Sequence, residues 1–321
     1  KTKIQIRSRA MSPNNYTGPR DETIVVRAPL RIPLGGDGTD LPSYWKGRGG
    51  FFISGAIDKY VTVALAPERG AVGAPMGDFE KDVLALIGAQ NREVTWTSDI
   101  TPGSGLGFSS ALTVAILYAV WTERERICRP AELARRAYHI ERELAPVGCQ
   151  DHYAAAFGGV VACEITPHGG VKPTQILPDY HADLWLDWFV LIDTGMRRSA
   201  AAILQHQDKK ASEGNVNVLQ CLSEIELIGR ESLKALERDD QKYLAALFSR
   251  HWGVKKRMSP KVTSAQIDKL YRAVSWAAGG KLIGAGGGGC FLFVNYPGKH
   301  VWLPGLRRIW FNWGKGAHRL K

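Results

Sequence analysis

The sequence predicts an α+β protein with two domains. Strand-like and helix-like stretches are mixed in each half of the chain, and this order favours the α+β class. The length of 321 residues is about twice that of a common single domain. The composition changes after Pro173 and Pro178, so we expect a basic tail over residues 1–22, a first domain over 23–182 and a second over 183–321.

The composition is that of a folded protein. Hydrophobic residues (45%) and charged residues (23%) occur at ordinary frequencies, and glycine, with 35 residues, is the one excess. No run approaches eighteen apolar residues, so the sequence shows no membrane span and no signal-peptide core of the usual form. We therefore expect a soluble, cytoplasmic protein without a membrane partner.

The net charge of +11 is concentrated at the two ends of the chain. Residues 1–10 and 298–321 together carry ten lysine and arginine residues and no acidic residue, which leaves a net charge of +1 for the part between them. A nearly neutral body does not favour a face that tracks phosphates, so we expect no nucleic-acid partner. The five cysteines are widely spaced without a C-x-x-C pair, and they support neither a disulfide framework nor a zinc site.

In the first half of the chain, residue type and periodicity predict strands and helices in turn. β-branched residues followed by Pro29 indicate a strand over 23–28, and apolar stretches around 54–60 indicate two more strands within 50–66. Residues 109–124 are apolar on nearly every side, which is typical of a buried helix. We also expect an amphipathic helix over 131–144 and glycine loops over 34–40 and 102–107.

The second half is predicted to begin with a buried strand over 185–194, where the sequence reads WLDWFVLIDT. Three helices should follow, near 214–238, 239–257 and 264–278. A final pair of strands should flank residues 284–289. The last 25 residues match no pattern from which a structure or a role can be predicted.

Residues 101–111 form a glycine-rich segment that we call the central loop. Its small residues let the backbone approach a ligand closely, and the helix that starts near Ser109 directs unpaired N–H groups and its positive dipole end into the same space. Such a loop can hold phosphate, although it is neither a Walker A loop nor a dinucleotide fingerprint. It also comes near the G-x-S-x-G nucleophile elbow, but Ala111 stands where the last glycine belongs. The alternative is a tight turn in which Ser109 or Ser110 caps a core helix.

A second candidate site lies around Asp151, just before a short alanine-rich helix. A carboxylate at this position could accept the proton of a substrate hydroxyl group, or it could cap the helix. Glu141 lies on the preceding helix, with Glu143 nearby. One of these carboxylates could hold a magnesium ion while another acts as the base.

Residues 284–289, which we call the C-terminal glycine loop, contain five glycines in six positions next to a predicted strand. A backbone without side chains lets another surface come close. A plain turn between two strands requires fewer glycines, so we expect this loop to contact a ligand or another loop.

Three segments of the chain, one of them before the central loop, together resemble the motifs of the GHMP small-molecule kinases, such as galactokinase, homoserine kinase, mevalonate kinase and phosphomevalonate kinase. The resemblance rests on their order along the chain: Pro29-Leu30-Arg31 leading to Asp40, then Pro102 to Ala111, then Lys281 to Cys290. The spelling A-P-L-R-I-x-x-G-G-x-G-T-D-L-P, with I-D-K-Y and G-x-Q-D-x-Y-A-A-x-F-G-G, is most similar to the D-glycero-D-manno-heptose 7-phosphate kinase branch. The similar region spans residues 23–295.

The resemblance implies a two-domain GHMP kinase fold, with an N-terminal domain like ribosomal protein S5 domain 2 and a C-terminal ferredoxin-like α/β sandwich. It also implies a kinase that uses ATP and Mg²⁺ to phosphorylate the anomeric hydroxyl group of D-glycero-D-manno-heptose 7-phosphate. Two alternatives stay open: a kinase of the same fold for another sugar such as fucose or galactose, and a non-catalytic relative that binds nucleotides or nucleic acid. The expected partner is a small sugar phosphate, and the expected state is a monomer or a homodimer.

By position, the resemblance implies that Asp151 is the catalytic base and that Arg31 lies beside it and the transferred phosphoryl group. Ser109 and Glu141 are placed like the magnesium ligands of the family. The residues that would surround the ATP phosphates are Pro102, Gly103, Ser104, Gly105, Leu106, Gly107, Ser109 and Ser110.

The substrate side is implied in the same way. The residues expected to bind the sugar are Gly36, Asp37, Thr39 and Asp40, together with Gly286 and Gly287 of the C-terminal glycine loop. For the substrate phosphate, the candidates are Lys59, Arg197 and Arg198, each of which could instead be a solvated surface charge. Two residues depart from the family pattern: Phe108 replaces the first serine of G-L-G-S-S-A, and Asp37 stands where the heptose branch usually has glycine, which leaves the identity of the sugar open.

Overall fold

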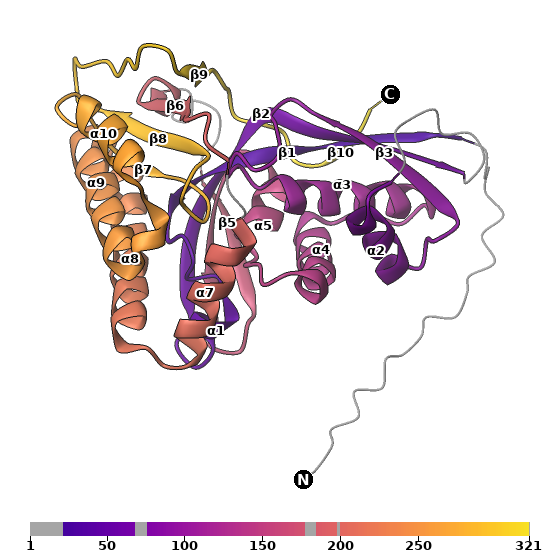
Figure 1. Ribbon diagram of the computed structural model, residues 1–321. Coiled ribbons are helices and arrows are strands. Elements are labelled where there is room, and N and C mark those ends of the chain that lie inside the picture. The colour runs from indigo at the N-terminus through magenta and orange to yellow at the C-terminus, as the bar shows by residue number, and fades with distance from the viewer. Residues whose placement is uncertain (1–21, 68–75, 177–183, 198–199, 321) are drawn as a thin grey trace, which may run out of the picture.

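Two antiparallel sheets and the helices that pack on them form the frame of the part of the chain that the structure describes (Figure 1). The structure is a computed structural model, and it describes residues 22–67, 76–176, 184–197 and 200–320. Each helix in these ranges is too short or too polar to cross a membrane. The α+β class predicted from the sequence is confirmed.

The first sheet, which has six strands among the described residues, is built around one long strand, β2 (Gly50–Pro67). β2 pairs with β1 (Ile24–Gly35) along most of its length. The beginning of β2 also pairs with β4 (Val160–Ile165), and its end pairs with β3 (Arg92–Ser98). The strand order is β10-β1-β2-β4-β5, where β5 is Val171–Ile176 and β10 is His318–Arg319.

β1 continues to Gly35, well past the end predicted at Ala28. Pro29 and Pro33 cannot donate a main-chain hydrogen bond, and the register against β2 shifts after each of them. These irregularities let the strand pass both prolines, so the prediction that it ends before Pro29 was wrong. The two strands predicted within 50–66 are one continuous strand.

Helices cover one face of the first sheet (Figure 1). α3 (Phe108–Glu123) packs on β1 and β2, with α4 (Pro130–Leu144) and α5 (Gln150–Phe157) beside it. Because neighbours surround α3, it buries side chains all round, and the predicted buried helix is confirmed. The amphipathic helix predicted over 131–144 is also confirmed. The other helices of this half in the described residues are α1 (Pro42–Trp45) and α2 (Asp78–Ile87).

The second sheet has the strand order β7-β8-β6-β9 in the described part of the chain. β6 (Phe189–Asp193) is shorter than the strand predicted over 185–194, because the chain is helical around Trp185. β7 (Ala278–Leu282) and β8 (Cys290–Asn295) are the predicted pair that flanks the C-terminal glycine loop, and β9 is Arg307–Ile309.

The helices of the second half include one that the sequence analysis did not predict, α7 (Ala200–Ser212). The three predicted helices are confirmed as α8 (Val216–Glu237), α9 (Gln241–Met258) and α10 (Ala265–Val274). α9 covers β7 and β8, and α8 packs on α9 as well as on β1 and β2 (Figure 1). α8 therefore joins the two sheets.

The end of the chain returns to the first sheet. β10 pairs with β1, where Arg319 lies opposite Val26, and Trp313 pairs with Ile57 of β2. No sequence pattern predicted this return. The basic tail expected over 1–22 lies outside the described residues except for Glu22, and so does the boundary expected between 182 and 183, so the division into domains stays a prediction.

α8 lies unusually close to the end of β1. A Cβ atom on Gly229 of α8 would lie 2.7 Å from the main-chain nitrogen of Gly36, and one on Gly35 would lie 2.8 Å from Cα of Gly229. Gly36 has a φ of 78° and begins the turn that carries Asp37 and Asp40. The approach of α8 therefore fixes the position of this turn.

We predict that Gly229→Ala lowers the free energy of unfolding by about 1–3 kcal/mol, because the added methyl group would push α8 away from β1. The matched control is Gly253→Ala in α9, where a Cβ would meet nothing within 4 Å. This control should raise stability by about 0.5–1 kcal/mol, as alanine normally does in a helix interior. Urea unfolding measures both free energies, and equal effects of the two substitutions would contradict the packing argument.

Candidate active site

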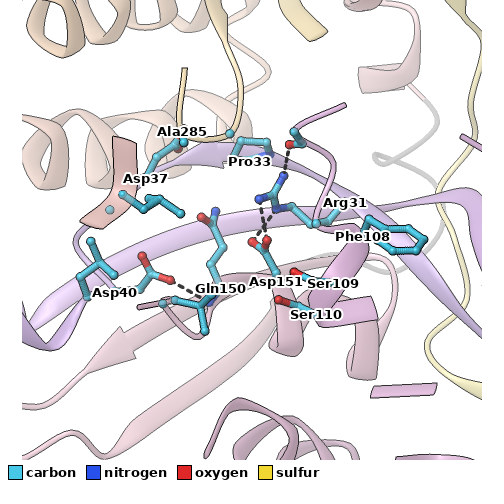
Figure 2. A pocket seen from close by; sticks show the side chains of 18 of the residues that line it. Arg31, Pro33, Asp37, Asp40, Phe108, Ser109, Ser110, Gln150, Asp151 and Ala285 are labelled. Carbon is cyan, nitrogen blue, oxygen red and sulfur yellow. Dashed lines mark hydrogen bonds and ion pairs between the residues drawn. The ribbon is translucent and has the colours of Figure 1, made fainter. Parts of the chain in front are cut away.

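Three segments that are distant in the sequence line one pocket. They are the end of β1 with its turn, the central loop with the start of α3, and Gly284 and Ala285 of the C-terminal glycine loop. Residues around the start of α5 and Leu204 of α7 complete the lining (Figure 2). The predicted site residues that line the pocket are Arg31, Asp37, Asp40, Gly103, Gly105, Gly107, Ser109, Ser110 and Asp151.

The central loop enters α3 at Gly107, which is the N-cap residue and has a φ of 79°. A Cβ atom there would lie 3.0 Å from Oδ2 of Asp151 and 3.2 Å from Cγ of Arg31. Because glycine has no Cβ atom, Gly107 can adopt the left-handed backbone and also lie this close to Asp151 and Arg31. The alternative in which Ser109 or Ser110 caps the helix is wrong, since both lie in the first turn of α3, where main-chain N–H groups have no partner within the helix.

The C-terminal glycine loop packs directly on the central loop, as its glycine content predicted. A Cβ atom on Gly105 would lie 2.7 Å from the carbonyl oxygen of Ile283, and one on Gly284 would lie 2.8 Å from Cα of Gly105. At its other end, the main-chain nitrogen of Gly289 donates to the carbonyl oxygen of Met196 at 2.8 Å. The two loops thus form one continuous wall of the pocket.

Arg31 and Asp151 form a bidentate ion pair in the middle of the pocket (Figure 2). Nε of Arg31 donates to Oδ1 of Asp151 at 2.6 Å, and Nη2 donates to Oδ2 at 2.7 Å. Nη1 donates to the carbonyl oxygen of Gly105 at 2.6 Å. The main-chain nitrogen of Arg31 donates to the carbonyl oxygen of Leu106 at 3.0 Å. Since the N-cap of α5 is Cys149, Asp151 does not cap the helix, and that alternative is wrong. The pair instead fixes the direction of the carboxylate.

Asp40 lies on one side of Asp151, and Ser109 and Ser110 lie on the other (Figure 2). Its Oδ2 accepts a hydrogen bond from the main-chain nitrogen of Gln150 at 2.8 Å. Burial raises the pKa of Asp40 to about 6, with the Gln150 N–H group opposing the shift and the negative charge of Asp151 adding to it. The carboxyl group of Asp40 therefore changes its charge close to neutral pH.

Asp37 lines the same side of the pocket as Asp40 and is paired with a buried lysine (Figure 2). Nζ of Lys281 donates to Oδ1 of Asp37 at 2.8 Å. Burial alone would raise the pKa of Asp37, but Lys281, His251 and Lys255 outweigh it and hold the pKa well below its usual range. The carboxylate is therefore ionised, and its ion pair ties the turn after β1 to the second sheet.

Several predicted site residues do not line the pocket. The main-chain nitrogen of Thr39 donates to the carbonyl oxygen of Gly36 at 3.1 Å and closes the turn, while its hydroxyl group lies 2.7 Å from the carbonyl oxygen of Phe51 in β2. These residues shape the backbone on which the lining residues are carried, and their predicted ligand contacts stay predictions. The group comprises Gly36, Thr39, Pro102, Ser104, Leu106, Gly286 and Gly287, of which Ser104 and Leu106 are buried and Gly286 packs on Val262.

Two of the three basic residues proposed for a substrate phosphate, Lys59 and Arg197, are described by the structure and are not among the lining residues. Lys59 pairs with Asp58 at 2.8 Å. Arg197 pairs with Asp193 at 2.7 Å. Arg197 lies beside the central loop, since a Cβ atom on Gly103 would be 3.5 Å from Cδ of Arg197. Arg198 lies outside the described residues.

Glu141 lies under the first turn of α3 and is only 1% exposed. Its Oε2 lies 2.7 Å from Nε2 of the buried His152. Burial raises the pKa of Glu141, but His152 and the hydroxyl groups of Ser109 and Ser110 outweigh it, so the pKa lies below its usual value.

Glu141 and Ser109 are suited to be the protein ligands of a Mg²⁺ ion. Glu141 is a buried carboxylate whose pKa is held below its usual value, and the hydroxyl group of the exposed Ser109 lies next to it, so the two supply the oxygen ligands that Mg²⁺ prefers. Mg²⁺ typically takes one or two protein ligands and completes its shell with phosphate oxygens and water. No group of three or more His, Cys, Asp or Glu residues that could hold a metal occurs in the described ranges, so phosphate oxygens would have to supply much of the shell.

Sequence reasoning missed several residues of this site, and three of them show why: Lys281, Gln150 and Leu204. Lys281 interrupts a buried, glycine-rich strand, and a charged residue in such a strand is a signal that could have found it. Gln150 directly precedes Asp151, and its Nε2 donates to the carbonyl oxygen of Ile53 at 3.3 Å. Leu204 lies on α7, and nothing in its local sequence indicates contact with the pocket.

Comparison with known proteins gives consistent matches. The sequence model of the protein family described as "GHMP kinases N terminal domain" matches residues 78–159. A D-glycero-alpha-D-manno-heptose 7-phosphate kinase from Campylobacter jejuni is 30% identical, covering 89% of this chain and 94% of its own. An L-fucokinase/L-fucose-1-P guanylyltransferase from Bacteroides fragilis is 24% identical, covering 85% of this chain and 35% of its own.

Solved structures show the same fold. A D-glycero-D-manno-heptose 1-phosphate kinase from Bacteriodes thetaiotaomicron superposes with a TM-score of 0.71 at 23% identity, covering 93% of this chain and 99% of the other. A Lactococcus lactis galactokinase complexed with galactose superposes with a TM-score of 0.70 at 15% identity, covering 95% of this chain and 97% of the other.

The raised pKa of Asp40 predicts a pH-dependent stability. The pKa is about 6 in the folded protein against 3.8 for the free group, so the folded state binds this proton more tightly than the unfolded state does. The resulting stabilisation is present below pH 4 and is lost as the pH rises through 6. A shift of this size corresponds to about 3 kcal/mol.

We therefore predict that Asp40→Asn, which cannot titrate but can still accept the Gln150 N–H group, becomes more stable relative to the wild type as the pH rises. The difference in the free energy of unfolding should change by about 2–3 kcal/mol between pH 4 and pH 7. Urea unfolding at several pH values measures it. A difference that stays constant over this range would show that Asp40 has an ordinary pKa.

Proposed function

We propose that this chain, which belongs to the GHMP kinase family, transfers the terminal phosphoryl group of ATP to the anomeric hydroxyl group of a sugar phosphate. The family, the GHMP kinase fold and the reaction class, a phosphotransferase with an alcohol group as acceptor, were all predicted from the sequence and are confirmed. We propose D-glycero-D-manno-heptose 7-phosphate as the substrate, because a relative that matches most of this chain is named as a kinase for that sugar.

The observation that carries the proposal is the position of the Arg31–Asp151 pair between two parts of one pocket. On one side are the central loop and the start of α3, and on the other are Asp37 and Asp40 (Figure 2). A nucleotide phosphate on the helix N-terminus and a sugar on the opposite side would meet at Asp151. This arrangement suits direct transfer between two bound substrates.

The chemistry follows from what phosphoryl transfer requires. Its loose transition state needs alignment and neutralisation of the charge that spreads over the phosphoryl oxygens. Main-chain N–H groups of the first turn of α3 and the hydroxyl group of Ser109 would donate to these oxygens, and Arg31 adds a positive charge. Asp151 would accept the proton of the attacking hydroxyl group. Since Arg31 engages both oxygens of Asp151, the carboxylate is oriented before the substrate binds.

Ser109 and Glu141 are the residues that would hold Mg²⁺. When bound, the ion would supply positive charge that neutralises part of the charge on the ATP phosphates. Glu141 is suited to this role because its carboxylate is ionised and lies against the hydroxyl groups of Ser109 and Ser110.

We also place the enzyme in the cytoplasm, where ATP is available.

Two other functions compete with this one. A kinase of the same fold for fucose or galactose is supported by the fucokinase relative and by the galactokinase structure. A non-catalytic binder of nucleotides or nucleic acid would have no use for the Arg31–Asp151 pair or for Glu141 below Ser109, so these residues speak against it.

A coupled assay of ADP release tests the proposal, with Mg²⁺ and ATP and a panel of phosphorylated and free heptoses, fucose and galactose. We predict the highest kcat/KM for the heptose 7-phosphate. Asp151→Asn should lower kcat by about 10²- to 10⁴-fold, because the general base is lost, and should change the KM for ATP by less than about threefold.

Asp82→Asn on the exposed face of α2 is the matched control and should retain wild-type turnover. Turnover by Asp151→Asn near the wild-type level would remove Asp151 from its role as base. A preference for fucose or galactose would replace the sugar but keep the kinase. Salt-sensitive RNA binding without ADP release on any sugar would favour the non-catalytic function.

A further inference from the structure

A group of buried, charged side chains stands behind the sugar side of the pocket. It consists of Asp37 on the turn after β1, His251 and Lys255 on α9, and Lys281 on β7. Lys281 is 0% exposed and pairs with Asp37, which lies 244 positions away in the sequence. Lys255 donates to the carbonyl oxygens of Leu282 and Gly284 and so anchors the strand end that leads into the C-terminal glycine loop.

Asp37 is the member of this group that lines the pocket in the described structure, and since its Oδ2 is buried, Oδ1 is the carboxylate oxygen left to face a ligand. Asp37 lines the pocket with 12% of its side chain exposed, whereas His251, Lys255 and Lys281 lie behind it. A ligand would therefore meet a negative charge before it meets an ammonium group. A carboxylate accepts a hydrogen bond from a hydroxyl group and repels a phosphate. This part of the wall is suited to a sugar hydroxyl group.

The direction of the Asp37 carboxylate depends on Lys281. Oδ1 is held by Nζ of Lys281 at 2.8 Å. Oδ2 lies 3.8 Å from Nε2 of His251, and both of these buried atoms are without a hydrogen-bond partner. If Lys281 were removed, the carboxylate could turn toward His251 and complete the bond that is now open.

The pair is also a costly way to stabilise a fold. Burying two charges offsets most of their attraction, and a pair of apolar residues of similar size often serves stability as well. Nζ of Lys281 lies 5.1 Å from the centroid of the Phe248 ring, and no member of the group is exposed enough for water to screen the pair fully. A role in binding accounts for a buried ion pair at this position better than stability does.

We propose that Lys281 is a positioning residue that aims the Asp37 carboxylate at a hydroxyl group of the sugar, on the side of Asp151 opposite to Ser109. This proposal rests on the proposed sugar kinase function. It assigns the discrimination between sugars that differ at one hydroxyl group to the Asp37–Lys281 pair.

The test compares Lys281→Met, Asp37→Asn, the double variant and a control, Lys256→Met. Lys256 is the neighbour of Lys255 on α9, and it pairs with Asp268 at the surface. The measurements are the thermal midpoint, sugar phosphate binding by calorimetry, and kcat/KM for the sugar phosphate and a set of its deoxy analogues. Lys281→Met leaves Asp37 buried without its partner and should lower the midpoint, whereas the double variant should recover most of that loss.

Sugar recognition should not recover in the double variant. We expect kcat/KM for the sugar phosphate to stay about 10- to 100-fold below the wild type in all three variants, with the KM for ATP changed by less than about threefold. The deoxy analogue that the wild type disfavours should be accepted by the variants as well as the full sugar. Lys256→Met should behave like the wild type.

Two results would overturn the inference. Recovery of both the midpoint and kcat/KM in the double variant would show that the pair serves the fold alone. Equal losses for ATP and for the sugar would show a general disturbance of the pocket. If the wild type binds the sugar phosphate without phosphorylating it, the proposed function fails while calorimetry on the variants still decides the role of Lys281. If it binds no sugar, both fail.

Discussion

The close approach of glycine-bearing backbones is the constraint on which the pocket depends. Gly105 touches Gly284, and Gly107 faces the Arg31–Asp151 pair, at distances that leave no room for a Cβ atom. If these backbones were held apart, the hydrogen bond from Arg31 to the carbonyl oxygen of Gly105 would be lost, and with it the link that fixes Asp151 to the central loop. The central loop, the Arg31–Asp151 pair and the C-terminal glycine loop are therefore held together as one packed unit.

Three carboxylates share this pocket, and their surroundings give them different properties. Asp151 is held by the guanidinium group of Arg31, and Asp37 is held by Lys281. Asp40 has a main-chain N–H group as its partner instead of a cation, and burial raises its pKa to about 6. The same chemical group is thus oriented by a guanidinium group in one case, kept ionised by a buried ammonium group in another, and left to titrate near neutral pH in the third.

The sequence predicted those features that local rules control. The glycine spacing around 101–111 and 284–289 requires close approach, and the structure brings both loops together. The helix boundaries of α3 and α4 follow from apolar patterning. The extension of β1 past Pro29 could not be predicted, because it depends on register shifts against β2.

Long-range pairs were also beyond local reasoning. The contact between Asp37 and Lys281 and the return of β10 to β1 join residues more than 240 positions apart. Nothing near either partner specifies the other. The candidate basic residues show a different limit: Lys59 and Arg197 pair with Asp58 and Asp193, only one and four positions away, but the sequence does not say whether a nearby carboxylate or a ligand takes up the charge.

The central claim is that Asp151 lies between the terminal phosphoryl group of a nucleotide and the anomeric hydroxyl group of a sugar. A crystal structure with a non-hydrolysable ATP analogue, Mg²⁺ and the heptose 7-phosphate tests it most directly. The account predicts an Asp151 oxygen within about 2.6–3.2 Å of the anomeric oxygen, with the terminal phosphate at the start of α3. A sugar bound away from Asp151, or a nucleotide bound away from the central loop, would contradict it.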